Sequence, residues 1–305
     1  MKFQPLDLAL GLLVTLIWGS NFSVIELGLE QLDPFLLTAL RFTCCALPLV
    51  FFMKRPTGVN LAAIAGYGLL FGVGLWWVVN YAMHLGLTPG LASLILQFSA
   101  FFTIFLSAWL LKEKIAGPQI AGVIVASLGL LSIIHFTEGQ AVLAGTALVL
   151  LAALSWSACN LIVKQTRPGD MVAFIVWSSL FAAPPLFLMT WLAKGSAPFY
   201  QLGTNLTPSA IFSVLFQAYV TTLFGYRVWN NLMKKYPSAM VAPLSLMVPI
   251  SGVTTSWLMF DESIGPYKLA SIVVILLGIA LFINASLIAN WLQARAPRQA
   301  NEPQG

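Results

Sequence analysis

Amide and indole side chains recur at helical spacing inside apolar stretches of the sequence. Trp18 and Asn21 lie three positions apart, and Trp156 and Asn160 lie four apart, so each pair shares one face of a helix. A polar side chain surrounded by hydrocarbon needs a partner, which a neighbouring helix or a water-filled cavity can supply. Such pairs could bind the polar ends of a small solute, with aromatic rings as a wall for its body.

Three other apolar stretches carry similar side chains along a single helix. They are Trp76, Asn80 and His84 in one stretch, Ser93, Gln97 and Phe101 in the next, and Gln217, Thr221 and Tyr226 in a later one. Amides and hydroxyls also join membrane helices to one another, and tryptophans also gather at the membrane interface. Both roles stay open for each residue. Central depth favours the solute pathway most at Trp18, Gln97 and Asn160.

Two arginines lie within apolar stretches, where their charge needs compensation. Arg41 lies about 10 Å along its helix from the outer surface. It could extend to that surface or pair with one of three nearby acidic residues, Glu26, Glu30 and Asp33. We expect Arg41 and Glu26 to form a gating or structural ion pair, in preference to direct contact with a solute. For Arg227, extension to the opposite surface and binding of a solute carboxylate both stay open.

The residue types that catalysis or metal binding would require are scarce. The two histidines, His84 and His135, are in no ligand spacing, and the three cysteines lie inside apolar runs. The chain has no Gly-x-Ser-x-Gly elbow, no phosphate-binding glycine loop and no His-Glu-x-x-His pair. We therefore expect a protein that is not an enzyme, has no cofactor or metal site, and acts on a small molecule.

The elements that position these side chains must be membrane-spanning α-helices. Of the 305 residues, 59% are hydrophobic and 8% are charged, against roughly 25% charged in soluble domains. Apolar runs long enough to cross about 30 Å of hydrocarbon recur along the whole chain. The sequence predicts an all-α polytopic membrane protein with ten transmembrane helices, over residues 6–28, 35–53, 59–83, 89–111, 116–136, 141–163, 171–193, 208–233, 238–260 and 266–290.

Basic residues indicate how these helices are oriented. A cytoplasmic N-terminus places eleven of the fifteen lysines and arginines on the cytoplasmic side, as the positive-inside rule requires. The eleven are Lys2, Lys54, Arg55, Lys112, Lys114, Lys164, Arg167, Lys234, Lys235, Arg295 and Arg298. The net charge of +5 forms no continuous patch, so we expect anionic lipid headgroups and no nucleic acid as partners. We expect an inner-membrane protein with both termini in the cytoplasm and leave the oligomeric state open.

An internal repeat supports the count of ten helices. A shift of 149 positions superposes eight pairs of residues, among them Glu113 on Glu262 and Gly129 on Gly278. Because each half holds an odd number of helices, the second half must be inverted, as in many secondary transporters. We expect a first five-helix repeat over residues 1–137, a second over 138–292, and a disordered cytoplasmic tail over 293–305. A membrane-bound sensor or assembly factor would not need matched polar pairs in inverted halves.

Several short segments resemble the EamA-type drug/metabolite transporters. In the first half they are Trp18-Gly19-Ser20-Asn21-Phe22, Leu40-Arg41-Phe42, Pro89 to Gln97, Phe101 to Ile104, and Lys112-Glu113-Lys114. In the second half they are Ala242 to Pro249 and Asp261-Glu262. The resemblance covers nearly the whole chain. Within the superfamily it is greatest to bacterial O-acetylserine/cysteine exporters.

The resemblance implies a bacterial inner-membrane protein with a central cavity between two inverted halves. It also implies efflux of amino acids or related small metabolites such as O-acetylserine and cysteine. Arg227 departs from the pattern, because the resemblance leads us to expect a small uncharged residue there, and this weakens the transfer of the substrate. The alternative is a permease for another small solute, such as a nucleobase or a drug-like amine.

Overall fold

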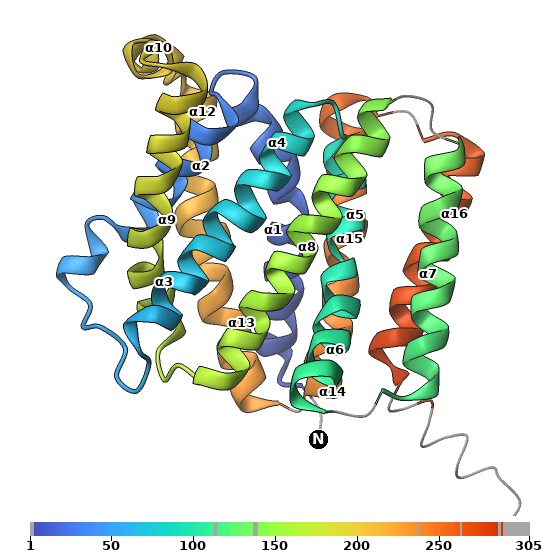
Figure 1. Cartoon of the computed structure of the whole chain (residues 1–305). Helices are drawn as coiled ribbons and strands as arrows, with labels where there is room; N and C mark the ends of the chain where they lie inside the picture. The colour runs from blue at the N-terminus through green and yellow to red at the C-terminus, as the bar shows by residue number, and fades with distance from the viewer. Residues whose placement is uncertain are drawn as a thin grey trace, which may run out of the picture.

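The computed structural model describes residues 3–112, 115–136, 140–236, 238–262, 264–285 and 288. Across these residues the chain forms a bundle of helices, with no strand (Figure 1). Ten helical stretches are long and apolar enough to cross a membrane. They span Pro5–Leu29, Pro34–Phe51, Leu61–His84, Pro89–Leu110, Gly117–Phe136, Val142–Thr166, Met171–Lys194, Pro208–Lys235, Ala242–Phe260 and Pro266–Ile283. The expectation of a ten-span all-α membrane protein is confirmed.

Several spans begin where a capping side chain precedes a proline. Asp33 accepts a hydrogen bond from the backbone nitrogen of Phe35 at 2.9 Å, and Thr88 and Thr207 cap the helices that follow them in the same way. The next residue is proline in all three cases, and its missing N–H would have no partner in the first turn anyway. These local signals explain why the predicted starts agree with the structure to within a few residues.

Five spans are single α-helices, and five are interrupted. The single helices are α1 (Pro5–Leu29), α7 (Gly117–Phe136), α8 (Gln140–Thr166), α9 (Met171–Lys194) and α16 (Pro266–Ile283). The second span comprises α2 (Pro34–Ala46) and the 3-10 turn η1 (Leu49–Phe51). The third comprises α3 (Leu61–Leu69), the π-helical segment η2 (Leu70–Trp77) and α4 (Val78–His84).

The fourth span breaks at Gln97 into α5 (Pro89–Leu96) and α6 (Phe98–Leu111). The eighth comprises α12 (Pro208–Leu215), the π-helical segment η3 (Phe216–Phe224) and α13 (Gly225–Lys235). The ninth comprises the 3-10 turn η4 (Ala242–Leu246) and α15 (Met247–Phe260), and the short helix α14 (Ser238–Val241) precedes it. Two short helices absent from the sequence prediction, α10 (Ala197–Tyr200) and α11 (Leu202–Asn205), precede the eighth span. The predicted end of the tenth helix at 290 and the tail over 293–305 lie outside the described residues.

Irregularities of the two halves occur at matching positions. Helices α6 and α15 each contain 14 residues, and they end at Lys112 (φ 56°) and Asp261 (φ 49°), both in the left-handed conformation. Lys112 and Asp261 lie 149 positions apart, the same shift that superposes the sequence repeat. The π-helical segments η2 and η3 likewise fall in the third span of each half. These matches are consistent with two related halves.

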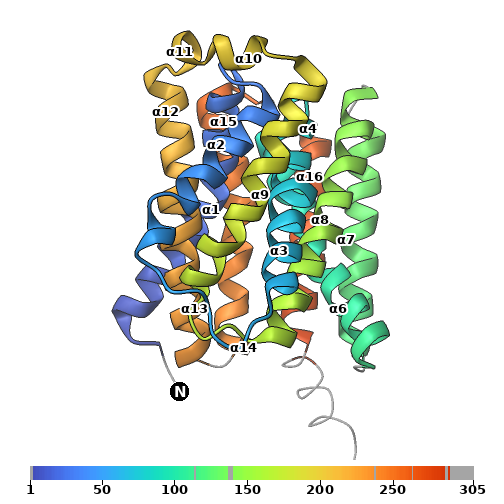
Figure 2. The same cartoon turned by 60° about the vertical axis from the view of Figure 1, so that its left-hand side comes forward.

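Pairs of helices from the two halves pack side by side. Helix α7 packs on α16, α2 on α9 and α1 on α15. Figure 1 shows the α7–α16 pair at one edge of the bundle, and in Figure 2 α7 stays at the edge while α16 lies behind other helices. Gly122 and Gly278 make the α7–α16 contact close, because a Cβ on Gly122 would lie 2.6 Å from the carbonyl oxygen of Gly278. Such backbone approach is how small residues bind membrane helices together.

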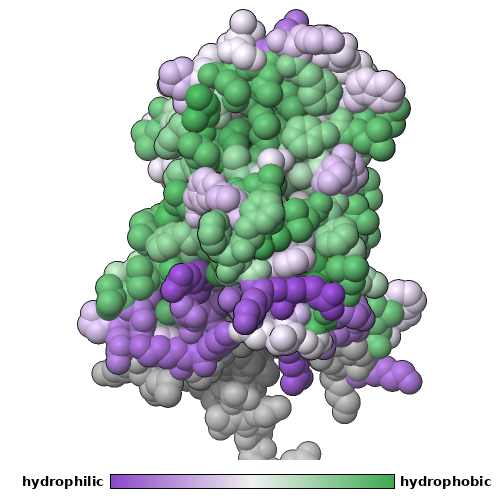
Figure 3. Space-filling model, turned by 90° about the vertical axis from the view of Figure 1, so that its left-hand side faces the viewer, coloured by the Kyte–Doolittle hydropathy of each residue, from purple (hydrophilic) through white to green (hydrophobic). Residues whose placement is uncertain are grey.

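The outer surface of the bundle matches a bilayer. Figure 3 shows a hydrophobic band around the middle of the molecule and a hydrophilic band near the end that holds the N-terminus. Large apolar side chains such as Trp109, Leu131 and Leu192 are more than half exposed on this surface. In a membrane these side chains contact lipid, so the polar groups inside the bundle must find partners there or in a cavity.

Candidate functional site

A cavity of about 390 Å³ lies between seven of the ten spans. Its lining includes Val163 near the end of α8, Met171 at the start of α9 and Met233 near the end of α13. These helix ends lie at the end of the bundle that holds the N-terminus of the chain. The lining also includes Phe22 and Trp76 from the middle of their spans. The cavity therefore extends from mid-depth toward the end of the bundle that holds the N-terminus.

Uncharged polar groups and aromatic rings make up most of the lining. They are Trp18, Phe22, Tyr67, Trp76, Gln97, Ser99, Trp156, Asn160, Thr221, Tyr226, Trp229, Asn230 and Ser245. Among the described residues that line the cavity, none carries a formal charge. This wall can hydrogen-bond the ends of a small polar molecule and pack rings against its body.

Contacts with the eighth span hold Trp18 in place. Its indole nitrogen donates to the backbone oxygen of Thr221 at 2.9 Å, and its ring lies 5.4 Å from that of Tyr226 and 5.2 Å from that of Trp229. The Thr221 hydroxyl donates to Asn21 Oδ1 at 2.9 Å. The helix carrying Trp18 is thereby fixed to one wall of the cavity by both polar and aromatic contacts.

Seven residues for which the sequence suggested a role in a solute pathway lie together at this cavity: Trp18, Trp76, Gln97, Trp156, Asn160, Thr221 and Tyr226. Gln97 sits at the break between α5 and α6. Asn160 is exposed, and its side-chain nitrogen donates to the hydroxyl of Thr103 at 3.2 Å. Helical spacing in the sequence thus identified side chains that the fold places around one cavity.

Four other predicted pathway residues are buried away from the cavity. Asn21, Asn80 and Gln217 are 0% exposed and bond to neighbouring helices, as Asn80 does to the hydroxyl of Thr38 at 2.9 Å. Phe101 is 1% exposed and packs against Phe282 with ring centroids 4.7 Å apart. In this structure these four side chains join helices, which is the alternative role that the sequence left open.

Arg227 lies in a second pocket, of about 420 Å³, at the same end of the bundle as the main cavity. Lys234 and Asp170 share this pocket, and Met171 and Asn230 line both spaces. The Arg227 side chain is exposed, and no hydrogen bond or ion pair joins it to another described residue. The second pocket adjoins the cavity, and its lining carries two cationic side chains and one carboxylate.

Sequence reasoning missed several lining residues, of which Tyr67 and Asn230 bring the most chemistry. Asn230 follows Tyr226 by four positions, so it shares the helical face of Tyr226. That spacing could have identified it. Tyr67 lies in α3, and Trp76 lies within the π-helical segment η2 that follows and shifts the helical register, so spacing alone would not place Tyr67 at the cavity.

Arg41 is fully buried in α2, at 0% exposure, beside both π-helical segments. Its guanidinium donates to Gln217 Oε1 at 3.3 Å and to the hydroxyl of Thr222 at 3.0 Å, both in η3. The guanidinium carbon lies 4.1 Å from the ring centroid of Trp76 in η2, within cation–π range. Among the described residues no carboxylate lies within ion-pair distance of Arg41, and Glu26 Oε2 is itself unpartnered. The expected Arg41–Glu26 pair is therefore not formed in this structure.

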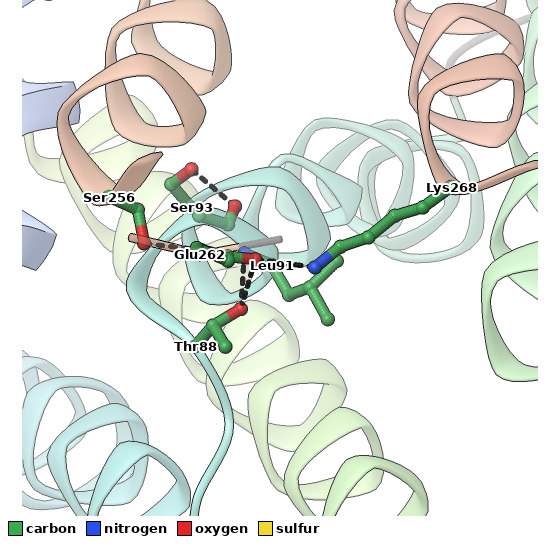
Figure 4. Close-up of polar contacts among 7 residues, drawn as sticks. Thr88, Leu91, Ser93, Ser256, Glu262 and Lys268 are labelled. Carbon is green, nitrogen blue, oxygen red and sulfur yellow. Dashed lines mark hydrogen bonds and ion pairs between the residues drawn. The ribbon is translucent and has the colours of Figure 1, made fainter. Parts of the chain in front are cut away.

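At the opposite end of the bundle from the cavity, a buried carboxylate ties three helices together (Figure 4). Glu262, which follows α15, is 8% exposed. It accepts hydrogen bonds from Thr88 at 2.7 Å and from Ser256, and it forms an ion pair with Lys268 at 2.6 Å. Because Thr88 caps α5, this cluster joins the fourth span to the ninth and tenth and closes that end of the bundle.

Comparison with known proteins adds to this geometry. The EamA-like transporter family matches residues 6–135 and 143–284. A protein of Escherichia coli strain K12 named "Probable amino-acid metabolite efflux pump" is 38% identical over 285 residues, which cover 91% of this chain and 94% of that one. A protein of the same name from Salmonella typhimurium is also 38% identical, over 90% of this chain and 93% of the relative.

A more distant relative and a solved structure are also similar to this chain. The uncharacterized transporter YoaV of Bacillus subtilis is 26% identical over 82% of this chain and 87% of its own length. A solved crystal structure that is 19% identical covers 95% of this chain and 100% of its own chain, with a TM-score of 0.62. The two matched segments hold five spans each and together include nearly all of the described helices. The chain belongs to the EamA-like transporter family.

Proposed function

We propose that the protein exports amino acids or related small metabolites, of the O-acetylserine and cysteine type, across the bacterial inner membrane. The observation that carries this proposal is the 390 Å³ cavity, whose uncharged amides, hydroxyls and rings can bind both ends of a small zwitterion. The names of the two relatives that are 38% identical point to the same class of substrate.

Charge distribution supports an orientation with both termini in the cytoplasm. The pocket beside the cavity carries Arg227 and Lys234, and the neighbouring surface carries Lys54 and Arg55. Basic loops stay on the cytoplasmic side, so the cavity faces the cytoplasm in this orientation. The Glu262 cluster then closes the periplasmic side, and the structure represents the state that loads substrate for export.

Two inverted five-helix halves, over residues 1–137 and 138–292, would account for alternation between this state and its opposite. The proposal is supported by the matched left-handed residues Lys112 and Asp261 and by the two segments that match the family. In such transporters one half rocks against the other around a site near mid-depth. The cavity has walls from both halves, as this motion requires.

Within the cavity, Trp18, Gln97, Asn160 and Tyr226 are proposed to contact the substrate, together with Trp76 and Trp156. The buried Asn21, Asn80, Gln217 and Phe101 would hold the walls. The side chain of Arg227 would attract the substrate's carboxylate at the entrance, because an exposed cation at the mouth of a pocket raises the local concentration of anions.

The test uses the purified full-length chain in liposomes that are loaded with labelled amino acids, including cysteine and O-acetylserine, and release is measured over time. We expect some amino acids of the panel to be released faster than from loaded liposomes without protein. They should also be released faster than from liposomes that contain a Trp18→Ala, Asn160→Ala double variant. If every amino acid of the panel is released no faster than from loaded liposomes without protein, export of amino acids is refuted.

A nucleobase or a drug-like amine is the alternative substrate, because the four cavity tryptophans offer flat faces for ring stacking. The same liposomes loaded with labelled adenine or an aromatic amine separate the two possibilities. Release of these compounds without release of any amino acid would favour the alternative.

A further inference from the structure

Arg41 carries a positive charge that no carboxylate among the described residues pairs with. The side chain is 0% exposed, its two hydrogen-bond acceptors among the described residues are an amide and a hydroxyl, and its Nε has no partner there. An isolated cation in a bundle surrounded by hydrocarbon is unfavourable, and intramembrane charges that persist are usually functional.

The position of Arg41 relates this charge to the cavity. Its guanidinium packs on the ring of Trp76, and Trp76 lines the cavity. On its other side it bonds to the π-helical segment η3, whose residue Thr221 also lines the cavity. Two π-helical segments, one from each half, therefore meet at one cation behind the cavity wall, and such segments occur frequently at functional sites.

We propose that Arg41 is the positioning residue for the substrate's carboxylate, acting through Trp76 from behind the cavity wall. This inference rests on the proposed function and adds that the substrate must carry a free carboxylate. A cavity without charged lining residues gives an anionic group no local preference of its own. The buried guanidinium supplies that preference, because a charge in a medium of low polarity acts over several ångströms with little screening.

Two substitutions separate this role from a structural one. Arg41→Met removes the cation and keeps a side chain of similar length. Gln217→Glu keeps the cation and places a carboxylate at the atom that already accepts from it at 3.3 Å, so Arg41 becomes neutralised inside the protein. Gln217→Met is the matched control, because it also removes the amide but adds no charge. Arg41→Lys keeps the charge without the guanidinium geometry.

The measurement is competition in proteoliposomes that transport labelled cysteine under reducing conditions. Unlabelled cysteine and cysteinamide, in which the carboxylate is replaced by a neutral amide, are compared as competitors. In the unsubstituted protein we expect cysteine to compete at a concentration on the order of tenfold below that of cysteinamide. Arg41→Met and Gln217→Glu should bring this ratio close to one, whereas Arg41→Lys and Gln217→Met should keep it, whatever happens to the total rate.

If Arg41 has only a structural role, Arg41→Met should lower the transport rate of labelled cysteine but leave the ratio of the competing concentrations of cysteinamide and cysteine unchanged. That result would overturn the inference. Equal competition by cysteine and cysteinamide in the unsubstituted protein would overturn it too, while the proposed amino-acid export would stand. Gln217→Glu keeps the test decisive if Arg41→Met does not fold. If no amino acid of the panel is released, and neither cysteine nor cysteinamide competes for transport, the proposed function fails. This inference then fails with it.

Discussion

The Glu262 cluster provides a quantitative test of how the end of the bundle opposite the cavity is closed, which is the outer end in the proposed orientation. Glu262→Gln keeps the shape of the side chain and removes its charge. The carboxylate has three partners, Thr88, Ser256 and Lys268, and its side chain is 6% exposed, so solvent screens these contacts little. Hydrogen bonds to a charged group contribute about 1.5–3 kcal/mol each, and neutral ones about 0.5–1.5.

The substitution should therefore destabilise the closed state by about 2 kcal/mol, because the glutamine amide can keep some of the hydrogen bonds in their weaker, neutral form. If the cluster is broken when the outer end opens, the ratio of open to closed molecules rises by roughly 30-fold. The contact between the fourth span and the ninth and tenth spans carries this effect. The stability of the rest of the bundle should change little, because the cluster lies at one end.

The assay measures access from outside. Ser99 lines the cavity, and no hydrogen bond of its hydroxyl group is seen in the structure, so a cysteine at this position can report on access. Cys44, Cys45 and Cys159 are first replaced by serine. Whole cells are then treated with a maleimide that does not cross membranes. We expect Glu262→Gln to increase the labelling rate of the reporter by about an order of magnitude.

Asp261→Asn is the matched control. Asp261 carries the neighbouring carboxylate, is exposed, and has the left-handed conformation that asparagine also tolerates. It should leave the labelling rate unchanged. Equal labelling of Glu262→Gln and the unsubstituted protein would show that the cluster does not control opening and would refute the reasoning.

Three further predictions concern packing and the cavity. Gly278→Val should lower the melting temperature in detergent by several degrees, since even a Cβ would meet the backbone of the facing helix, whereas Gly66→Ala, with no atom nearby, should not. Trp18→Phe removes an indole hydrogen bond of 2.9 Å and should raise the KM for release about three- to tenfold; an unchanged KM would place the substrate elsewhere. Lys235→Met breaks the half-exposed ion pair with Asp7 and should barely shift the melting temperature, so a large loss would contradict a solvent-screened pair.

Hydropathy and turn chemistry were sufficient to predict the ten spans, because both signals depend on residues that are close together in the sequence. Asp33, Thr88 and Thr207 cap helices through atoms two or three residues away, and the prolines that follow them are visible in the sequence. The breaks inside spans were not predicted. At Gln97 the chain interrupts a continuous apolar run, and no proline or glycine marks the break at that position.

The candidate site was predictable only in part, for a related reason. Helical spacing finds residues that share a face but does not tell which face meets the cavity, so Trp18 and the fully buried Asn80 looked alike. The partners of Arg41 show the limit more sharply. Sequence proximity pointed to Glu26, whereas Gln217 lies 176 positions away and reaches Arg41 only through the packing of α2 on η3.

The absence of charged groups from the lining of the main cavity, within the part of the chain that the structure describes, has an energetic consequence. A zwitterionic solute carries no net charge, and the lining itself adds none, so the passage of the solute moves no net charge across the membrane. The transmembrane voltage does work of about 2.3 kcal/mol per elementary charge for each 100 mV. For such a solute that work vanishes, so export through this cavity proceeds at the same equilibrium ratio in energised and de-energised membranes unless a separate ion is carried along.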